Sequence, residues 1–528
     1  MTPNPSRRRA RSITAGAGAA LVVLSAAACG STVRNAHEIL AQRAQAGYDS
    51  GALGNAPTRV APTASAPGVA GGNPSASTGA GDTAAGAVVT PGAARGTRRG
   101  ATQPPTSTTT PTNAPKHHAA VFTGPAKLAP VEVGVAVSQD VGQFAKLFGG
   151  TADVGNLETD SNAVIAYINK HGGFAGHVVR PVYYSIQLTS TQPYSTTMAA
   201  ICSSWTEDHK VAAGIAVGFN IPNDLAQCLS AKHIPYLSGG NYLHDSTSYQ
   251  QIPYLISPYE AGTDEVMSAL LPHLLNSGWL TAKSHVGVLL ASNETAAVRA
   301  YNNVIVPELK GRVAAVTQYG VNFPPSTQAA VATSQTISND ELHARANGVT
   351  NVIFLAPGAE GSFIDDAYQQ KWFPKYAITS FDTPWAGTLA HNKEERATLA
   401  GSIGIGWQPT MDVGTYGNNV FTNPVTRTCN SILKPTGQLT SNVREFAGYQ
   451  FCDALLSVQA AANASGAASV VGPAILAGYN ALGTSHPDAM TFAERIDAHQ
   501  HNGASAFRPL TYSPSCSCFR YTGGLSSF

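Results

Sequence analysis

The chain has 528 residues, enough for two or three domains, with a formal net charge of +1 and 12% charged residues. So little charge gives no basic surface for nucleic acid, and we expect no nucleic-acid partner. Apart from one short segment near the start, no apolar run approaches the roughly 20 residues of a membrane-spanning helix.

The first 28 residues have the pattern of a bacterial secretory signal peptide. A basic cluster from Arg7 to Arg11 precedes an apolar stretch from Ala15 to Leu24, and small residues follow up to Ala28. Cys29 then stands at the first mature position, which resembles the lipobox of bacterial lipoproteins. The resemblance implies a diacylglycerol anchor on Cys29 and a protein on the outer face of the cell membrane. Ordinary secretion, with Cys29 incidental, is the alternative.

Residues 29–122 consist mainly of Ala, Gly, Pro, Ser and Thr, with hardly an aromatic side chain. Such a segment cannot bury enough apolar surface to offset the entropy lost on ordering. We therefore expect a disordered, low-complexity linker between the anchor and a folded part that begins near Leu128.

From Leu128 onward, short apolar runs of strand length alternate with helical patterns. The predicted strands are 131–137, 178–184, 211–217, 235–237, 285–290, 314–319, 351–355 and 376–380. The predicted helices are 159–169, 224–231, 263–275, 296–309, 329–345 and 362–371. This alternation predicts an α/β fold with parallel sheets covered by helices on both faces, and two consecutive series predict two doubly wound, Rossmann-like lobes. Ligands of such sheets bind beyond the carboxyl ends of the strands.

Six cysteines follow Cys29, an even number that predicts up to three disulfides in an oxidising compartment. Proximity in the sequence favours the pairs Cys202–Cys228, Cys429–Cys452 and Cys516–Cys518. Other connectivities remain open, and the last pair closes a small ring. No zinc-like spacing of Cys or His is present, so we expect no metal site and no cofactor.

Two segments carry a resemblance to a known family. Residues 168–176, I-N-K-H-G-G-F-A-G, resemble the turn I-N-x-x-G-G-I-x-G of periplasmic binding proteins of the leucine/isoleucine/valine type, and residues 233–240, H-I-P-Y-L-S-G-G, resemble their G-I-P-x-I-S-x-G. The resemblance implies a type I clamshell with a hinge of three crossings, near residues 258, 407–412 and 508–511. The first lobe would then be 128–258 plus 412–508, and the second 259–411 plus 509–528.

The same resemblance implies a set of ligand-binding residues at the strand ends. In the first lobe they are Phe148, Gly218, Phe219, Asn220, Gly240 and Asn241; in the second they are Asn293, Gly358, Ala359 and Asp382. Asparagines supply donors and acceptors, and Asp382 could bind an ammonium or hydroxyl group. Where the family has Ser or Thr at the amino-acid carboxylate and tyrosines in the second lobe, this chain has other residues. That difference leaves room for a bulkier or more polar ligand than a branched-chain amino acid.

The sequence contains no Gly-x-Ser-x-Gly elbow, Walker loop or His-Glu-x-x-His motif, and we expect no enzyme. The expected function is that of an extracytoplasmic, monomeric solute-binding protein that delivers a small polar solute, an amino acid or related compound, to the permease of an ABC importer. The alternative is a binding module of the same fold that serves a sensor or the cell envelope without transport. The sequence does not specify the ligand.

Overall fold

The computed structural model describes eleven stretches of the chain: 122, 124–138, 140–147, 152–217, 223–240, 242–322, 327–384, 386, 396–413, 423–484 and 488–528. The predicted signal peptide, Cys29 and all of the predicted linker except its last residue lie outside these residues. Within them, no helix combines the length and the apolar character that crossing a membrane requires.

The first sheet has five parallel strands in the order β2-β1-β3-β4-β5. The strands are β1 (Leu128–Ser138), β2 (His177–Ile186), β3 (Gly214–Val217), β4 (Tyr236–Gly239) and β5 (Leu255–Ile256). The central strands β3 and β4 are buried along their whole length, as expected for strands covered on both faces. The order reverses between β1 and β3, so this is a doubly wound sheet with its switch point at these two strands. We call the sheet and its helices the first lobe.

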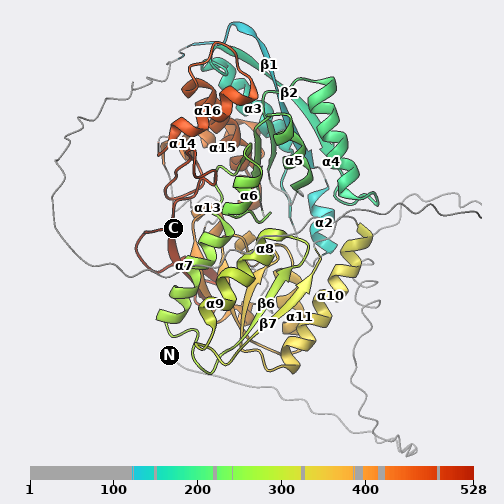
Figure 1. The fold of residues 1–528 in the computed structure, drawn as a ribbon, viewed down its shortest axis with the longest axis vertical. Helices are drawn as coiled ribbons and strands as arrows, with labels where there is room; N and C mark the ends of the chain where they lie inside the picture. The colour runs from blue at the N-terminus through green and yellow to red at the C-terminus, as the bar shows by residue number, and fades with distance from the viewer. Residues whose placement is uncertain are drawn as a thin grey trace, which may run out of the picture. The chain divides into compact units, whose positions relative to one another are not determined.

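Among the residues that the structure describes, eight helices belong to this lobe. They are α2 (Val141–Leu147), α3 (Leu157–Lys170), α4 (Tyr194–Ser203), α5 (Asn223–Ala231), α6 (Ser246–Gln251), α14 (Pro424–Leu433), α15 (Asn442–Ala464) and α16 (Gly472–Leu482). In Figure 1, α4 and α5 lie on one side of the sheet, and α3, α15 and α16 lie on the other. Short helical turns follow α4 at Ser204–Asp208 and α14 at Lys434–Thr436. The predicted covering of both sheet faces is therefore confirmed.

The second sheet has the order β12-β11-β10-β9-β8-β6-β7, and β13 pairs with β11. Its strands are β6 (His285–Ala291), β7 (Ala315–Val321), β8 (Asn351–Leu355), β9 (Lys375–Thr379), β10 (Ile403–Gly406), β11 (Ala506–Ser513), β12 (Cys518–Tyr521) and β13 (Ser526–Ser527). Strands β6 to β10 are parallel, whereas β11 is antiparallel to its neighbours. We call this sheet and its helices the second lobe, and its switch point lies between β6 and β8.

The helices of the second lobe follow the predicted pattern. They are α7 (Thr263–Asn276), α8 (Thr295–Ala300), α9 (Val306–Leu309), α10 (Thr327–Ala346) and α11 (Glu360–Gln369), with a 3-10 turn at Arg396–Leu399. The short helix α13 (Pro409–Asp412), which was not predicted, follows β10 where the chain leaves the second sheet and lies against α15 of the first lobe. A π-helical turn, Tyr301–Ile305, joins α8 to α9, so the helix predicted over 296–309 is one continuous helical stretch.

The glycine-containing segment that carries the family resemblance forms the corner between α3 and β2. The side chain of Asn169 donates to the carbonyl of Val179 at 2.9 Å and accepts from its amide at 2.7 Å, which ties the end of α3 to the strand. Gly173 has a φ of 61°, and its amide closes the helix by donating to Ile168 at 2.8 Å. The motif therefore fixes the corner between α3 and β2.

Within the described residues, the chain passes between the two sheets in three segments, 257–260, 406–409 and 502–505, which we call the hinge segments. The amide of Gly503 donates to Ser257 at 2.8 Å, and Gln408 Nε2 donates to the carbonyl of Tyr259 at 3.3 Å. Since β11 begins at Ala506, the third segment lies a few residues before the expected crossing at 508–511. The first segment therefore contacts both of the others.

Three cysteine pairs lie at disulfide distance, and they are the pairs favoured by sequence proximity. The Sγ–Sγ distances are 1.88 Å for Cys202–Cys228, 2.05 Å for Cys429–Cys452 and 1.98 Å for Cys516–Cys518. The first two lie in the first lobe, where Cys429 and Cys452 are fully buried. The third lies between β11 and β12 of the second lobe.

Candidate functional site

Gly240, directly after β4, is the predicted first-lobe site residue that the structure describes. Its φ of 114° favours glycine, and its amide donates to Glu260 Oε1 at 3.2 Å. Gly239 before it packs so closely on the ring of Tyr259 that a Cβ there would overlap the hydroxyl. The end of β4 is thus held against the first hinge segment. The other predicted first-lobe residues lie outside the described residues: Phe148, Gly218, Phe219, Asn220 and Asn241.

Glu260 connects the three hinge segments. Besides Gly240, its carboxyl accepts from Gln408 Nε2 at 3.1 Å, and its backbone carbonyl accepts from the amide of Ala504 at 3.0 Å. The side chain is buried, and burial raises its pKa to about 8, although the hydrogen bonds from Gly240 and Gln408 oppose the shift. Glu260 therefore keeps its proton at neutral pH in the folded protein.

The turn after β6 places an exposed amide beside a buried carboxyl. Asn293 is exposed, whereas Glu294 is only 1% exposed. Burial raises the pKa of Glu294 to about 8, and the nearby Leu243 amide partly opposes the rise. The hydroxyl of Tyr242 has a raised pKa, mainly from its own burial and then from Glu294. Because Tyr242 and Leu243 follow β4, the strand-end segments of the two lobes meet at Glu294.

Gly358, Ala359 and Asp382 come together at the ends of β8 and β9. The amide of Gly358 donates to Glu360 Oε2 at 2.7 Å, and Asp382 Oδ2 accepts from the amide and hydroxyl of Thr379 at 2.7 and 2.9 Å. Burial, followed by repulsion from Asp382, raises the pKa of Glu360 well above its ordinary value. Burial also raises the pKa of Asp382 to about 7. The two carboxyl groups at this edge therefore carry less than two full negative charges at neutral pH.

Asp412 fixes the adjoining end of β10. Its carboxyl accepts from Ser380 Oγ at 2.8 Å, from Thr383 Oγ1 at 2.7 Å and from the hydroxyl of Tyr521 at 2.5 Å. The amide of Gln408 also donates to it, at 3.1 Å. Burial raises the pKa of Asp412 to about 6, against these hydrogen bonds. The loops after β9 and β10 are therefore tied to the second hinge segment.

Three buried glutamates of this region, Glu260, Glu294 and Glu360, were absent from the residues predicted from the sequence. Two of them directly follow a predicted residue: Glu294 follows Asn293, and Glu360 follows Ala359. The sequence signal that could have identified these glutamates is an acidic residue that follows an apolar strand. The sequence pattern does not show whether such a residue is buried, and burial is what changes its chemistry.

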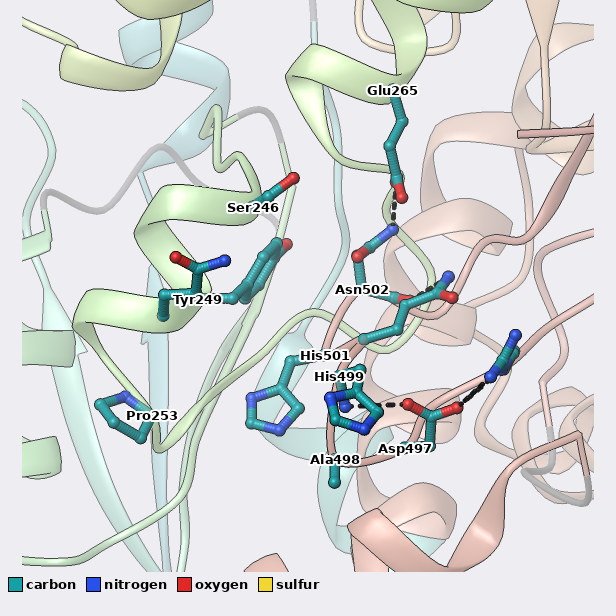
Figure 2. A pocket seen from close by; sticks show the side chains of 12 residues that line it. Ser246, Tyr249, Pro253, Glu265, Asp497, Ala498, His499, His501 and Asn502 are labelled. Atoms are coloured by element: carbon teal, nitrogen blue, oxygen red, sulfur yellow. Dashed lines mark hydrogen bonds and ion pairs between the residues drawn. The ribbon is translucent and has the colours of Figure 1, made fainter. Parts of the chain in front are cut away.

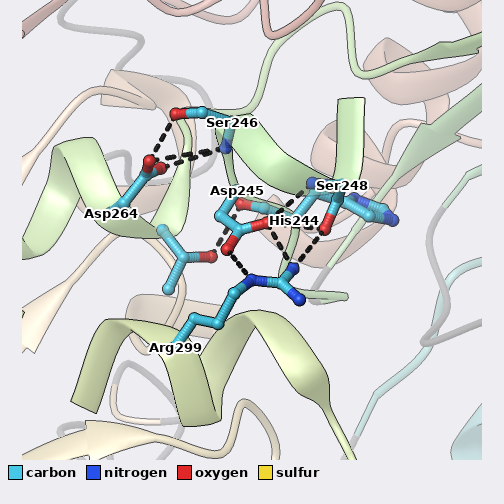
Figure 3. A network of polar contacts seen from close by, with 7 residues as sticks. His244, Asp245, Ser246, Ser248, Asp264 and Arg299 are labelled. Atoms are coloured by element: carbon cyan, nitrogen blue, oxygen red, sulfur yellow. Dashed lines mark hydrogen bonds and ion pairs between the residues drawn. The ribbon is translucent and has the colours of Figure 1, made fainter. Parts of the chain in front are cut away.

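An ion pair links Asp245, the N-cap of α6 in the first lobe, to Arg299 in α8 of the second (Figure 3). Arg299 donates through Nε to Asp245 Oδ2 and through Nη2 to Asp245 Oδ1, both at 2.6 Å, and Nη2 also reaches Ser248 Oγ at 3.1 Å. Burial favours the protonated acid, but the hydrogen bonds of Arg299 and Ser248 outweigh it and lower the pKa of Asp245. Ser246, next along α6, also bonds to Asp264 at the start of α7. Both bonds join the lobes outside the hinge segments.

A polar cavity of about 460 Å³ lies beside the hinge, between α6, the start of α7 and residues 495–502 (Figure 2). Glu265 points to Asn502, whose Nδ2 donates to Glu265 Oε2 at 2.6 Å. Asp497 is paired with Arg495 at 2.7 Å. None of the predicted site residues that the structure describes lines this cavity. Within the part of the chain that the structure describes, no group of three or more His, Cys, Asp or Glu side chains could hold a metal ion.

Comparison with known proteins identifies the fold. No protein-family model and no curated protein matches the sequence. A leucine-binding protein from Thermotoga maritima matches with a TM-score of 0.53 and 12% identity, over 74% of this chain and 98% of that chain. A branched-chain amino acid ABC transporter structure from Thermus thermophilus with bound valine gives 0.52 and 13%, over 76% and 97%. A fatty acid ABC transporter substrate-binding protein from Thermomonospora curvata gives 0.52 and 12%, over 77% and 93%. The chain therefore has the type I periplasmic binding fold, as its sequence resemblance predicts.

Proposed function

We propose that this protein is an extracytoplasmic solute-binding protein that captures a small solute between its two lobes and delivers it to an ABC-type permease. The observation that carries the proposal is the joining of two doubly wound sheets by three hinge segments, with polar groups at the ends of β4, β6, β8 and β9. A hinge of this kind allows the lobes to close on a ligand. Closure would also create the surface that a permease recognises.

The solute we propose is a small polar compound, an amino acid or a related molecule. Asn293 offers an exposed amide with both donors and acceptors, and Gly240 allows close approach to the backbone. Asp382, with a pKa of about 7, can exchange its proton for a charge-assisted bond to a ligand donor. The three matched structures include proteins named for leucine, for branched-chain amino acids and for fatty acids, so a longer apolar group is an alternative that the binding assay must include.

Anchoring is the second part of the proposal. Cys29 would carry the lipid, and residues 30–122 would let the lobes reach a permease from the outer face of the membrane. A binding module that serves a sensor is the alternative. Uptake of a labelled ligand by cells with and without the gene distinguishes them, since only a transport role requires that uptake falls when the gene is deleted.

A thermal-shift screen of the full chain with leucine, valine, glutamine, 4-hydroxybenzoate and decanoate tests the proposal. A ligand at 100 times its Kd stabilises the folded state by about 2.7 kcal/mol, which is a measurable shift in Tm. We expect N293A and D382N to weaken the effect of the stabilising compound, and E207Q, on the exposed end of the segment after α4, to leave it unchanged. Equal stabilisation of all three variants would refute this site assignment while leaving solute binding itself intact.

A further inference from the structure

The pair Cys516–Cys518 lies at the tip of the hairpin formed by β11 and β12. The two residues are separated by Ser517 alone, and their sulfur atoms lie at disulfide distance. Cys516 is exposed and Cys518 is half-buried. A thiol in solution can therefore approach this pair in the folded protein.

A cation stands beside one of the two sulfur atoms. Arg520 lies in β12, two residues after Cys518, and its Nε donates to Cys516 Sγ at 3.3 Å. A guanidinium group at this distance stabilises a thiolate, and a stabilised thiolate is the better leaving group when a disulfide is attacked. The site thus favours departure of Cys516.

The backbone of the ring also favours opening. Ser517 has a φ of 53°, in the left-handed region that residues other than glycine rarely adopt. Closing the ring holds Ser517 between two cysteines in this conformation, and reduction frees it. Opening the disulfide therefore relieves local backbone strain.

The Cys429–Cys452 pair provides the contrast. Cys429 and Cys452 are fully buried, and this pair closes a loop of 23 residues. A long closed loop restrains the unfolded chain strongly, whereas a separation of 2 residues restrains it least. The Cys429–Cys452 disulfide is therefore explained by the stability that it gives the fold. The Cys516–Cys518 disulfide is explained less well in this way.

We propose that Cys516–Cys518 is a thiol–disulfide exchange site whose substrates are thiols. The thiolate of the first thiol molecule attacks Cys518 Sγ, forms a mixed disulfide and breaks the Cys516–Cys518 bond, so that the electron pair stays on Cys516 beside Arg520. A second thiolate attacks the substrate sulfur of the mixed disulfide and expels Cys518 as a thiolate. Two thiols are thereby oxidised to one disulfide, the protein gains two electrons, and the two protons released by the thiols are taken up by the two cysteine thiolates or the solvent. This activity is independent of solute binding.

Glutathione is the probe for this inference. The folded full-length protein is incubated with increasing glutathione, quenched with N-ethylmaleimide, digested and analysed by mass spectrometry. We expect Cys516 and Cys518 to be modified at concentrations at least about tenfold below those that open Cys429–Cys452, with the early glutathione adduct on Cys518. Opening of both pairs at the same concentration would overturn the proposal, and an early adduct on Cys516 would overturn the order of attack.

A pair of arginine variants tests the role of the cation. R520Q should slow the opening of Cys516–Cys518 about fivefold, because the leaving thiolate loses its partner. R312Q removes an exposed arginine from the turn after α9, where it pairs with Glu308, and should leave the rate unchanged. Equal rates for R520Q and R312Q would refute the assigned role of Arg520.

Discussion

Replacement of Glu260 by glutamine tests the most unusual electrostatic feature of the hinge. The Glu260 carboxyl is buried where the three hinge segments meet, and burial raises its pKa from 4.5 to about 8. The folded protein therefore holds the proton more tightly than the unfolded chain does. Between these two pKa values the folded state binds more protons, so the contribution of Glu260 to stability is complete below pH 4.5 and is lost as the pH rises toward 8.

The magnitude follows from this difference in pKa. At about 1.4 kcal/mol per pKa unit, the loss between pH 5 and pH 8 amounts to about 3 kcal/mol. Glutamine has nearly the same shape as protonated glutamate, and its oxygen can accept the hydrogen bond from Gly240. Because glutamine cannot ionise, E260Q should lack this loss. Its stability relative to the natural protein should therefore rise by about 3 kcal/mol from pH 5 to pH 8.

Urea unfolding at pH 5, 6, 7 and 8 measures the difference. The comparison of E260Q with the natural protein cancels the contributions of the other buried acids. E207Q, which changes an exposed glutamate in the first lobe, is the matched control and should follow the natural protein at every pH. A difference between E260Q and the natural protein that is the same at pH 5 and pH 8 would refute the reasoning, because a carboxyl that titrates normally gives no such dependence.

Three further predictions concern the ion pair between the lobes, the first core and the anchor. R299Q should lower the free energy of unfolding by about 2 kcal/mol at pH 7, because it leaves the buried Asp245 without its cation. R312Q breaks an exposed ion pair and should change this free energy by less than about 0.5 kcal/mol, and equal losses for the two variants would contradict the prediction. G134A should lower the free energy of unfolding in urea by about 1–3 kcal/mol, because the added Cβ would stand 2.5 Å from the Trp205 ring in the core of the first lobe. G524A, which has open space around it, should be neutral, and a neutral G134A would show that this core tolerates the added methyl group. C29S should move the protein from the membrane fraction to the medium in a fractionation blot, and retention in the membrane would exclude the lipid anchor.

The sequence predicted strands β1 to β4 and β6 to β9, and most of the helices between them, because their patterns are strong, but it did not predict β5 or β10 to β13. Strand β1 is mostly apolar and its last six residues are buried, and α11 and α7 carry regular buried stripes. Helix α4 was not predicted, although its buried residues Tyr194, Met198 and Ile201 have helical spacing. Its serines and threonines favour turns locally, and packing against α5 overrides that preference.

The candidate site was less predictable than the fold. The resemblance implied residues at strand ends, but the raised pKa values of Glu260, Glu294 and Glu360 depend on burial. Burial at the hinge arises from contacts between residues far apart in the chain, such as Glu260 with Gln408 and Ala504. A local sequence pattern carries no information about such contacts.

Isothermal titration calorimetry on the full chain tests most directly whether the protein binds a small solute. The ligand is the compound that raises Tm most among leucine, valine, glutamine, 4-hydroxybenzoate and decanoate. We expect one bound molecule per chain, weaker binding by N293A and D382N, and unchanged binding by E207Q. The absence of binding heat and of any Tm shift for the whole panel would contradict the proposal that the two lobes capture a small solute of these classes.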